Sequence, residues 1–239
     1  MKAALYKKDL VSFFYSNSLY VVFIAYALLS AVMTFFWGEY LVNDDLTMRA
    51  FFVYQPQIMA IIIPAVTMRC WAEERKSGTI ENLLTFPLSD TELMFSKFAA
   101  SLTIAVMMML FSLPLLITTA VYVPLDWGNV LSDYMGLFCV VCVLTAAGCL
   151  VSAMTAMPVI AYLGAMMFNV LWINLKLGSL VTRWWSNTPF YFREVLNFDA
   201  NYQNFLNGQI NPASLIYFLT FAGFLLLCNA LIIVGWRTK

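Results

Sequence analysis

The chain has 239 residues, of which 62% are hydrophobic and 11% are charged, and its formal net charge is zero. Its mean hydropathy is +0.81. Soluble domains carry about 25% charged residues, so this composition excludes an ordinary soluble protein and indicates one embedded in a membrane.

The first element, residues 2–16, is predicted to be a short amphipathic helix lying along the membrane surface. Three lysines and Asp9 form its polar part, and Leu5, Leu10 and Phe13 contribute to its apolar part. The alternative is a frayed terminus with basic anchors. The segment lacks the short apolar core and small-residue cleavage site of a secretory signal.

Long uncharged stretches then predict an all-α polytopic membrane protein that forms one transmembrane domain over residues 1–239. One crossing takes about 20 apolar residues at about 1.5 Å per residue. The stretch 134–175 is too long for one helix, and Pro158 in its middle predicts two crossings joined by a tight turn. The predicted spans are 19–37, 51–68, 98–121, 134–155, 158–175 and 212–235.

Positive charge predicts the orientation of these spans. Six crossings place both termini on one side of the membrane, together with the segment 69–97 between the second and third spans. Nine Lys and Arg residues fall on that side and four on the other. The positive-inside rule therefore predicts that both termini and the segment 69–97 are cytoplasmic.

The segment 69–97, called the insert below, contains nine charged residues and several signals for helix ends. Gly78 is a natural stop for a helix that continues from the second span. Thr79 can cap a short helix over about 80–86, which Pro87 then ends. A passive linker that carries charge for topology is the alternative.

A second signal in the insert predicts where the third membrane helix begins. Ser89 and Glu92 have the spacing of a capping box, in which each side chain bonds the other residue's backbone N–H. The helix that follows would lead into the third span through Lys97. The insert is thus predicted to hold a short crosswise helix between two long ones, so that force on it tilts the second and third spans.

The stretch from Glu73 to Lys97 resembles the signature of ABC-2 type transporter permeases. It has an acidic-basic cluster, Gly-Thr, Glu, a Leu pair, Pro and a polar turn before Lys. The resemblance covers essentially the whole chain. The block from Phe198 to Pro212 is similar to the branch of gliding-motility permeases and of the permease for nitrous-oxide-reductase maturation.

The resemblance implies that the insert is a coupling helix seated on a separate nucleotide-binding ATPase subunit, which would hold ATP and Mg. It also implies two permease copies, with a homodimer expected, in a bacterial cytoplasmic (inner) membrane. The residues implied in coupling are Glu73, Glu74, Arg75, Gly78, Thr79, Ile80, Glu81, Leu84 and Pro87.

The function predicted on this basis is the permease subunit of an ATP-driven exporter. The chain has no Gly-x-x-x-x-Gly-Lys-Ser/Thr phosphate loop, so it is not expected to bind ATP or to be an enzyme. The alternative is a mechanotransmitter that acts on an outer-face partner without moving a substrate. Membrane lipid is an expected partner, nucleic acid is not, and an accessory outer-face or periplasmic subunit stays open.

The outer segment 176–211 is predicted to contain two short interfacial helices. One would begin at Thr188-Pro189 and the other at Asp199, ending at Gly208. Trp and Tyr favour the membrane boundary, so these helices either close the outer end of a pathway or simply anchor the protein. The outer gate candidates are Trp184, Trp185, Phe190 and Tyr202.

The spans are predicted to carry no buried charge, which argues against a proton- or sodium-driven carrier. Their polar side chains either line a pathway or bond neighbouring helices. The pathway candidates are Gln55, Gln57, Thr118, Asn169 and Asn229. Cys139, Cys142 and Cys149 share one helix face and form either a redox or metal pair or a seam of small residues; with no His in the chain, no metal is expected.

Overall fold

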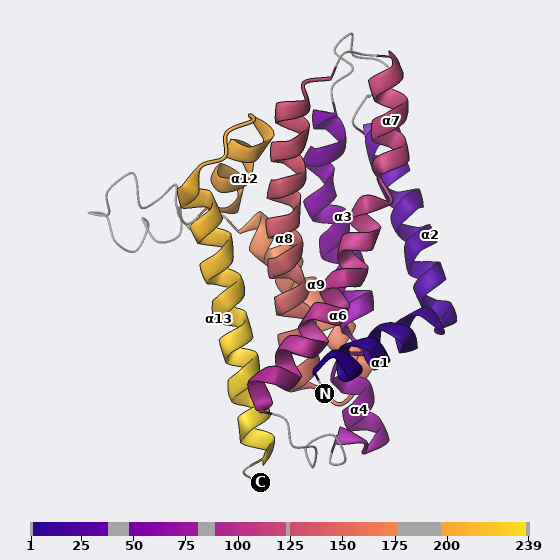
Figure 1. The fold of residues 1–239 in the computed structure, drawn as a ribbon, viewed down its shortest axis with the longest axis vertical. Helices are drawn as coiled ribbons and strands as arrows, with labels where there is room; N and C mark the ends of the chain where they lie inside the picture. The colour runs from indigo at the N-terminus through magenta and orange to yellow at the C-terminus, as the bar shows by residue number, and fades with distance from the viewer. Residues whose placement is uncertain (1, 38–47, 81–88, 123–124, 176–196, 238–239) are drawn as a thin grey trace, which may run out of the picture.

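A computed structural model describes residues 2–37, 48–80, 89–122, 125–175 and 197–237. These residues form an all-helical bundle without a strand, as predicted, and most helices run along one axis (Figure 1). The helices are α1 Lys2–Phe14, α2 Asn17–Val32 with a π-helical turn Met33–Trp37, α3 Arg49–Thr67, α4 Ala72–Ser77, α6 Asp90–Leu110, α7 Leu113–Tyr122, α8 Trp127–Met154, α9 Pro158–Asn174, α12 Phe198–Leu206 and α13 Pro212–Arg237.

Among the described residues, five segments are long and apolar enough to cross a membrane. They are Asn17–Phe35, Phe51–Ser77, Asp90–Tyr122, Trp127–Met154 and Pro212–Trp236. The remaining predicted span corresponds to α9, an apolar helix of 17 residues. At 1.5 Å per residue it is about 26 Å long, against a hydrocarbon core of about 30 Å. The turn predicted before Pro158 is confirmed, whereas a sixth crossing stays a prediction.

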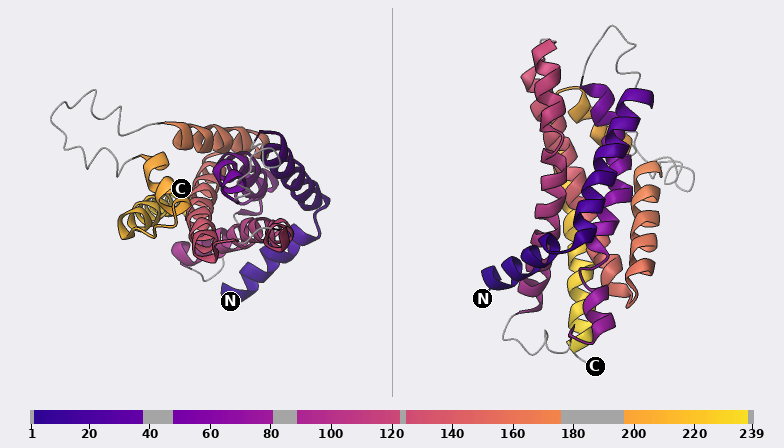
Figure 2. Two further views of the ribbon diagram at one scale, coloured as in Figure 1. Left: turned by 90° about the horizontal axis from the view of Figure 1, so that it is seen from above. Right: turned by 90° about the vertical axis from the view of Figure 1, so that its right-hand side faces the viewer.

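Helix α8 is the centre of the bundle and contacts α3, α6, α9, α12 and α13 (Figure 2). Small residues let its neighbours approach closely. A Cβ atom added to Gly148 would lie 2.8 Å from Cβ of Thr67 on α3, and one added to Gly136 would lie 2.6 Å from Cβ of Phe205 on α12. Small residues serve this purpose in membrane helix packing generally.

The third predicted span is not one continuous helix. Helix α6 ends at Leu110, and α7 begins at Leu113. The Ser112 hydroxyl donates to the Met109 carbonyl oxygen at 2.7 Å, and Pro114 has no N–H to continue the ladder. The third predicted span, 98–121, therefore falls within one candidate span, Asp90–Tyr122, which is interrupted next to Pro114.

A buried acidic side chain lies one residue before the predicted start of the fourth span, 134–155. Helix α8 begins at Trp127, several residues before the predicted start at 134, because Asp126 caps it by accepting from Gly128 N at 3.0 Å. The earlier start brings Asp133 into the helix, where it is 4% exposed. This buried carboxyl group weakens the argument that uncharged spans exclude a proton- or sodium-driven carrier.

Helix α12 confirms one of the two helices predicted in the outer segment. It has Asp199 in its first turn and ends just before Gly208, whose φ of +72° suits a residue without a Cβ. Its apolar face packs on α8, α9 and α13. The rings of Phe198 on α12, Trp172 on α9 and Phe218 on α13 have centroids 5.0–6.2 Å apart. The helix predicted at Thr188-Pro189 lies outside the described residues.

Candidate functional site

Both ends of the chain lie at one end of the bundle, called the terminal end below (Figure 1). Helix α4 and the start of α6, which flank the centre of the insert, lie at this end too. The structure describes the insert over 69–80 and 89–97. Three predicted coupling residues, Glu81, Leu84 and Pro87, lie outside the described residues, as does the predicted crosswise helix.

The helix-end signals on either side of that gap are confirmed. Helix α4 ends at Gly78, which has a φ of +71°. The capping box is formed as well, because Glu92 N donates to Ser89 Oγ at 3.3 Å and Ser89 N donates to Glu92 Oε2 at 3.4 Å. Both ends of the central insert segment are thus fixed by their own local chemistry.

The described base of the insert is organised around Lys97, a residue of α6 with a side chain only 5% exposed. Its ammonium group lies 2.8 Å from Glu74 Oε1 and 3.7 Å from Asp9 Oδ2. It also donates to the Cys70 carbonyl oxygen at 2.9 Å and lies 5.0 Å from the centre of the Trp71 ring. One cation therefore joins α1, α4, α6 and the turn after α3.

These contacts explain how a lysine is tolerated there. Removing a charge from water costs several kcal/mol, and only close opposite charges and hydrogen bonds offset that cost. The ammonium has three N–H donors, and Glu74, Asp9 and the Cys70 carbonyl surround it. The Trp71 face adds an electrostatic attraction. Loss of Lys97 would leave the carboxylates of Glu74 and Asp9 without their counter-charge.

Arg75 extends the same contacts to α8 and α13. Its guanidinium donates to the Ala153 carbonyl oxygen at 3.0 Å, near the end of α8, and lies 5.2 Å from the ring centre of Trp236. The cation thus faces the negative end of the α8 dipole. Trp236 in turn packs edge-on against Trp71 with centroids 5.6 Å apart. The end of the last helix is thereby tied to the insert.

Ser152 on α8 holds the turn between α3 and α4. Its hydroxyl oxygen accepts from the backbone N–H groups of Trp71 and Ala72 at 3.1 and 3.2 Å, and its O–H donates to the Met68 carbonyl at 3.1 Å. One buried hydroxyl therefore satisfies three backbone groups that no helix satisfies.

We call this assembly the Lys97 junction. It consists of Asp9, Cys70, Trp71, Glu74, Arg75, Lys97, Ser152, Ala153 and Trp236. Helix α1 is further fixed by a 2.9 Å contact between the hydroxyls of Tyr6 and Thr103 on α6. Arg69 donates to Ser16 Oγ at 2.6 Å, just after α1. Helices α1, α6, α8 and α13 therefore meet the base of the insert in one cluster.

The predicted coupling residues in the described part of the insert fall into two groups. Glu74 and Arg75 are used within the chain, as members of the Lys97 junction. Glu73, Gly78 and Thr79 are exposed, and Ile80 is half-buried. Their contact with an ATPase stays a prediction.

Sequence reasoning missed the central role of Lys97 and the parts played by Ser152 and Trp236. A signal for Lys97 was present, because it is the one Lys or Arg between Lys76 and Lys176. Nothing in the local sequence marks Ser152, because the groups it satisfies are 80 or more residues away in the chain.

The predicted pathway residues differ in burial and in their hydrogen bonds. Gln55 is buried and its Oε1 accepts from the Tyr26 hydroxyl at 3.1 Å, so it joins α2 and α3. Asn169 and Asn229 are fully buried, and their amides have no hydrogen-bond partner within the described part of the chain. Gln57 and Thr118 lie on the exposed surface of the bundle. A pathway role for these five stays a prediction.

Of the predicted outer gate residues, the structure describes Tyr202. Its ring is 4% exposed and its hydroxyl donates to the Phe52 carbonyl oxygen at 2.8 Å. Burial, reinforced by the Asp133 charge, raises the pKa of Tyr202 well above its ordinary value, so the phenol stays protonated. Trp184, Trp185 and Phe190 lie outside the described residues.

Cys70, a member of the Lys97 junction, lies next to Cys149 of α8. The sequence analysis had considered a pair among Cys139, Cys142 and Cys149. Cys70 Sγ and Cys149 Sγ lie 3.7 Å apart and both residues are buried. Within the described ranges, no group of three or more His, Cys, Asp or Glu side chains is placed to hold a metal ion.

The chain matches a family model described as "ABC-2 family transporter protein" over residues 7–174. The match runs from α1 to the end of α9 and includes every member of the Lys97 junction except Trp236. No curated protein matches the chain. Because the match covers most of its length, the chain belongs to the ABC-2 family of transporter membrane proteins.

Proposed function

We propose that this chain is the permease subunit of an ATP-driven ABC-2 exporter, and that force from a separate ATPase subunit enters it through the insert. Membership of the ABC-2 family supports an ATPase partner in general terms. The proposal adds two points to family membership: the direction of transport is export, and the coupling site is the insert.

The observation that carries the coupling site is the Lys97 junction. The central part of the insert begins after α4 and ends at Ser89. An ion pair joins its two flanks, because Glu74 lies on α4 before it and Lys97 lies on α6 after it. Packed, hydrogen-bonded contacts move as units rather than deforming continuously. A push on the insert would therefore be passed to α1, α6, α8 and α13 together.

The proposed topology has six crossings, with α9 as the fifth. It packs along α3 and α8, which are themselves candidate spans. The two ends of the chain lie at the same end of the bundle in Figure 1, as an even number of crossings requires. The excess of Lys and Arg on that side supports a cytoplasmic terminal end.

A photo-crosslinking experiment tests the coupling site. A photoreactive amino acid replaces Thr79, which is exposed on the insert, or Trp127, which is 63% exposed at the start of α8 near the opposite end. The chain is extracted in a mild detergent together with its ATPase. We expect an ATPase adduct from position 79 and none from position 127. Adducts from position 127 alone would refute the coupling site.

A further inference from the structure

Cys70 and Cys149 bring two thiol groups into contact although they lie 79 positions apart in the sequence. Their sulfur atoms are 3.7 Å apart, and both are free cysteines. Cys70 lies in the turn after α3, and Cys149 lies on α8. A disulfide between them would tie this turn to the central helix of the bundle.

The backbones on both sides of the cysteine pair are also close to each other. Gly148, next to Cys149, leaves no room for a Cβ atom beside Thr67. Ser152 Oγ, one helical turn after Cys149, lies 3.1 Å from the backbone nitrogen of Trp71. A disulfide needs sulfur atoms about 2.05 Å apart on Cα atoms about 5.5–6 Å apart. Because the turn and α8 are held together here, rotation of the two side chains can close the sulfur gap while the helices stay in contact.

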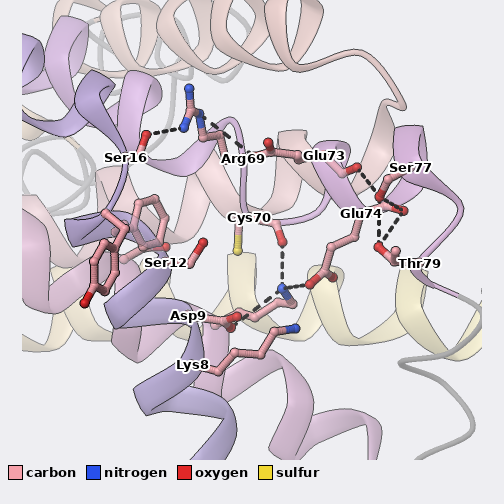
Figure 3. A pocket seen from close by; sticks show the side chains of 14 residues that line it. Lys8, Asp9, Ser12, Ser16, Arg69, Cys70, Glu73, Glu74, Ser77 and Thr79 are labelled. Atoms are coloured by element: carbon pink, nitrogen blue, oxygen red, sulfur yellow. Dashed lines mark hydrogen bonds and ion pairs between the residues drawn. The ribbon is translucent and has the colours of Figure 1, made fainter.

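The two thiols differ in their access to water. Cys70 lines a cavity of about 510 Å³ between α1 and the described base of the insert (Figure 3). Exposed side chains such as Lys8 and Glu73 line the same cavity, so water reaches it. Cys149 does not line it and is 1% exposed. A small neutral oxidant in the cavity therefore meets Cys70 first.

We propose that Cys70 and Cys149 are a two-cysteine oxidation site, which hydrogen peroxide converts to a disulfide. The Cys70 sulfur attacks one peroxide oxygen, so that an S–O bond forms, the O–O bond breaks and one water leaves. The Cys149 sulfur then attacks the sulfur of this Cys70 sulfenic acid, and the sulfenic oxygen leaves as a second water when the S–S bond forms. The two thiols lose two electrons and two protons in total, and the peroxide takes them up.

The position of the pair gives the disulfide a regulatory consequence. Cytoplasmic thiols are normally kept reduced, and the disulfides that form there are usually transient and redox-sensing. The Cys70 carbonyl accepts from Lys97 at 2.9 Å, so a covalent bond from Cys70 to α8 holds the Lys97 junction in one position. Oxidation then blocks the passage of force from the insert, a consequence that rests on the proposed coupling function and cytoplasmic orientation.

Counting free thiols in the purified full chain tests the oxidation site. The chain in mild detergent is treated with hydrogen peroxide, and the remaining thiols are alkylated after denaturation. We expect three of the five cysteines to be alkylated, with a peptide containing Cys70 linked to one containing Cys149, and all five to be alkylated after reduction with dithiothreitol. Absence of the linked peptide would overturn the proposal.

Two buried cysteines of α8 provide a matched pair of variants. Cys149→Ala removes the partner of Cys70, and Cys139→Ala makes the same change about 15 Å away along the helix. The link to Cys70 should be lost in the first variant and kept in the second. Cys149→Ser, which preserves the size of the side chain, repeats the test if Ala destabilises the fold. A link to Cys70 that persists without Cys149 would contradict the assigned pair.

A probe for sulfenic acids tests the order of the two steps. Dimedone, which forms a stable adduct with a sulfenic acid, should label Cys70 in Cys149→Ala, because no second thiol remains to displace the oxygen. Cys149 in Cys70→Ala should be labelled much less, since its sulfur lies away from the cavity. Equal labelling of the two cysteines would overturn the role of the cavity.

Peroxide treatment of the assembled complex separates the oxidation site from its consequence. ATP hydrolysis by the wild-type complex should fall about fivefold, recover with dithiothreitol, and change little in the Cys149→Ala complex, which has the same ATPase subunit. A full rate in a wild-type complex that contains the linked peptide would overturn the regulatory consequence and uphold the oxidation site. Failure of the photo-crosslinking test would refute the coupling site and leave the thiol count unaffected.

Discussion

The two ends of the bundle are held together by different kinds of contact. At the terminal end, Lys97 and Arg75 bind carboxylates and backbone carbonyls of distant helices. At the opposite end, α12 is held by edge-on rings, such as Phe198 against Trp172 of α9, whose ring centroids lie 5.0 Å apart. One end depends on compensated charges and the other on buried aromatic area.

The difference bears on how movement passes through the chain. A buried charge has a few positions in which all its partners are satisfied, so elements joined by it shift together or separate at high cost. Aromatic surfaces slide past one another with smaller changes in free energy, since each pair contributes only about 0.5–1.5 kcal/mol beyond burial. The terminal end is therefore suited to receive force, and the opposite end to yield to it.

The largest loss of stability is predicted for substitution of Lys97. Replacing Lys97 with Met leaves Glu74 and Asp9 without their cation, and breaking a buried ion pair in this way typically costs about 3–5 kcal/mol of unfolding free energy. Lys76→Met, at an exposed position on α4, removes the same charge as a control and should change stability little. Thermal unfolding in detergent measures both. Equal midpoints for the two variants would show that the junction contributes no stability.

The second prediction concerns Ser152, also at the terminal end. Ser152→Ala leaves the buried N–H groups of Trp71 and Ala72 without an acceptor, and each such loss costs about 1–3 kcal/mol. Hydrogen exchange of these two amides should speed up with the substitution, while that of Leu137 in the middle of α8 should not. Unchanged exchange at Trp71 would contradict the assigned contacts.

The third prediction concerns Gly136, where α8 contacts α12 at the opposite end of the bundle. Gly136→Ala places a methyl group 2.6 Å from Cβ of Phe205, so α12 must shift, at a cost of about 1–3 kcal/mol. Gly223→Ala on α13 meets no atom within 4 Å and is the matched control. The unfolding midpoint should fall for the first substitution and hold for the second. A midpoint that holds or rises in both variants would mean that helix propensity, which favours Ala over Gly, outweighs the contact with α12.

The smallest effect is predicted for Tyr202. Tyr202→Phe keeps the ring and removes the hydrogen bond to Phe52, which costs about 1 kcal/mol. The raised pKa of Tyr202 means that the folded protein resists ionisation of this phenol. Its contribution is constant at neutral pH and declines as pH rises above the ordinary value of 10.0. The stability difference between the wild-type chain and Tyr202→Phe should therefore narrow above that pH, and a difference that widens there would show the opposite sign of shift.

Much of the helical fold was predictable because local signals specify it. Gly78, the Ser89–Glu92 capping box and Pro158 mark helix ends through interactions within a few residues of themselves. The early start of α8 was missed because its first two turns contain Gly128, Asn129 and Asp133, which lower the hydropathy of the segment, although Asp126 caps the helix there. Local chemistry decided that boundary, and average hydrophobicity did not.

The Lys97 junction was only partly predictable. The insert was recognised by its charge, but Glu74 and Arg75 were assigned to an external partner because the sequence does not reveal which charges are paired within the chain. Their partners, Lys97, Ala153 and Trp236, lie 23 or more residues away and on other helices. Pairings over such distances depend on the packing of the whole bundle.

The most direct test of force transmission follows the opposite end of the bundle while ATP binds to the partner subunit. A fluorescent amino acid at position 127 of the assembled complex reports movement at the start of α8. The account predicts an ATP-dependent change in emission that persists in Lys76→Met and is lost in Lys97→Met, in complexes that remain assembled. A full ATP-dependent change in assembled Lys97→Met would contradict transmission through the Lys97 junction.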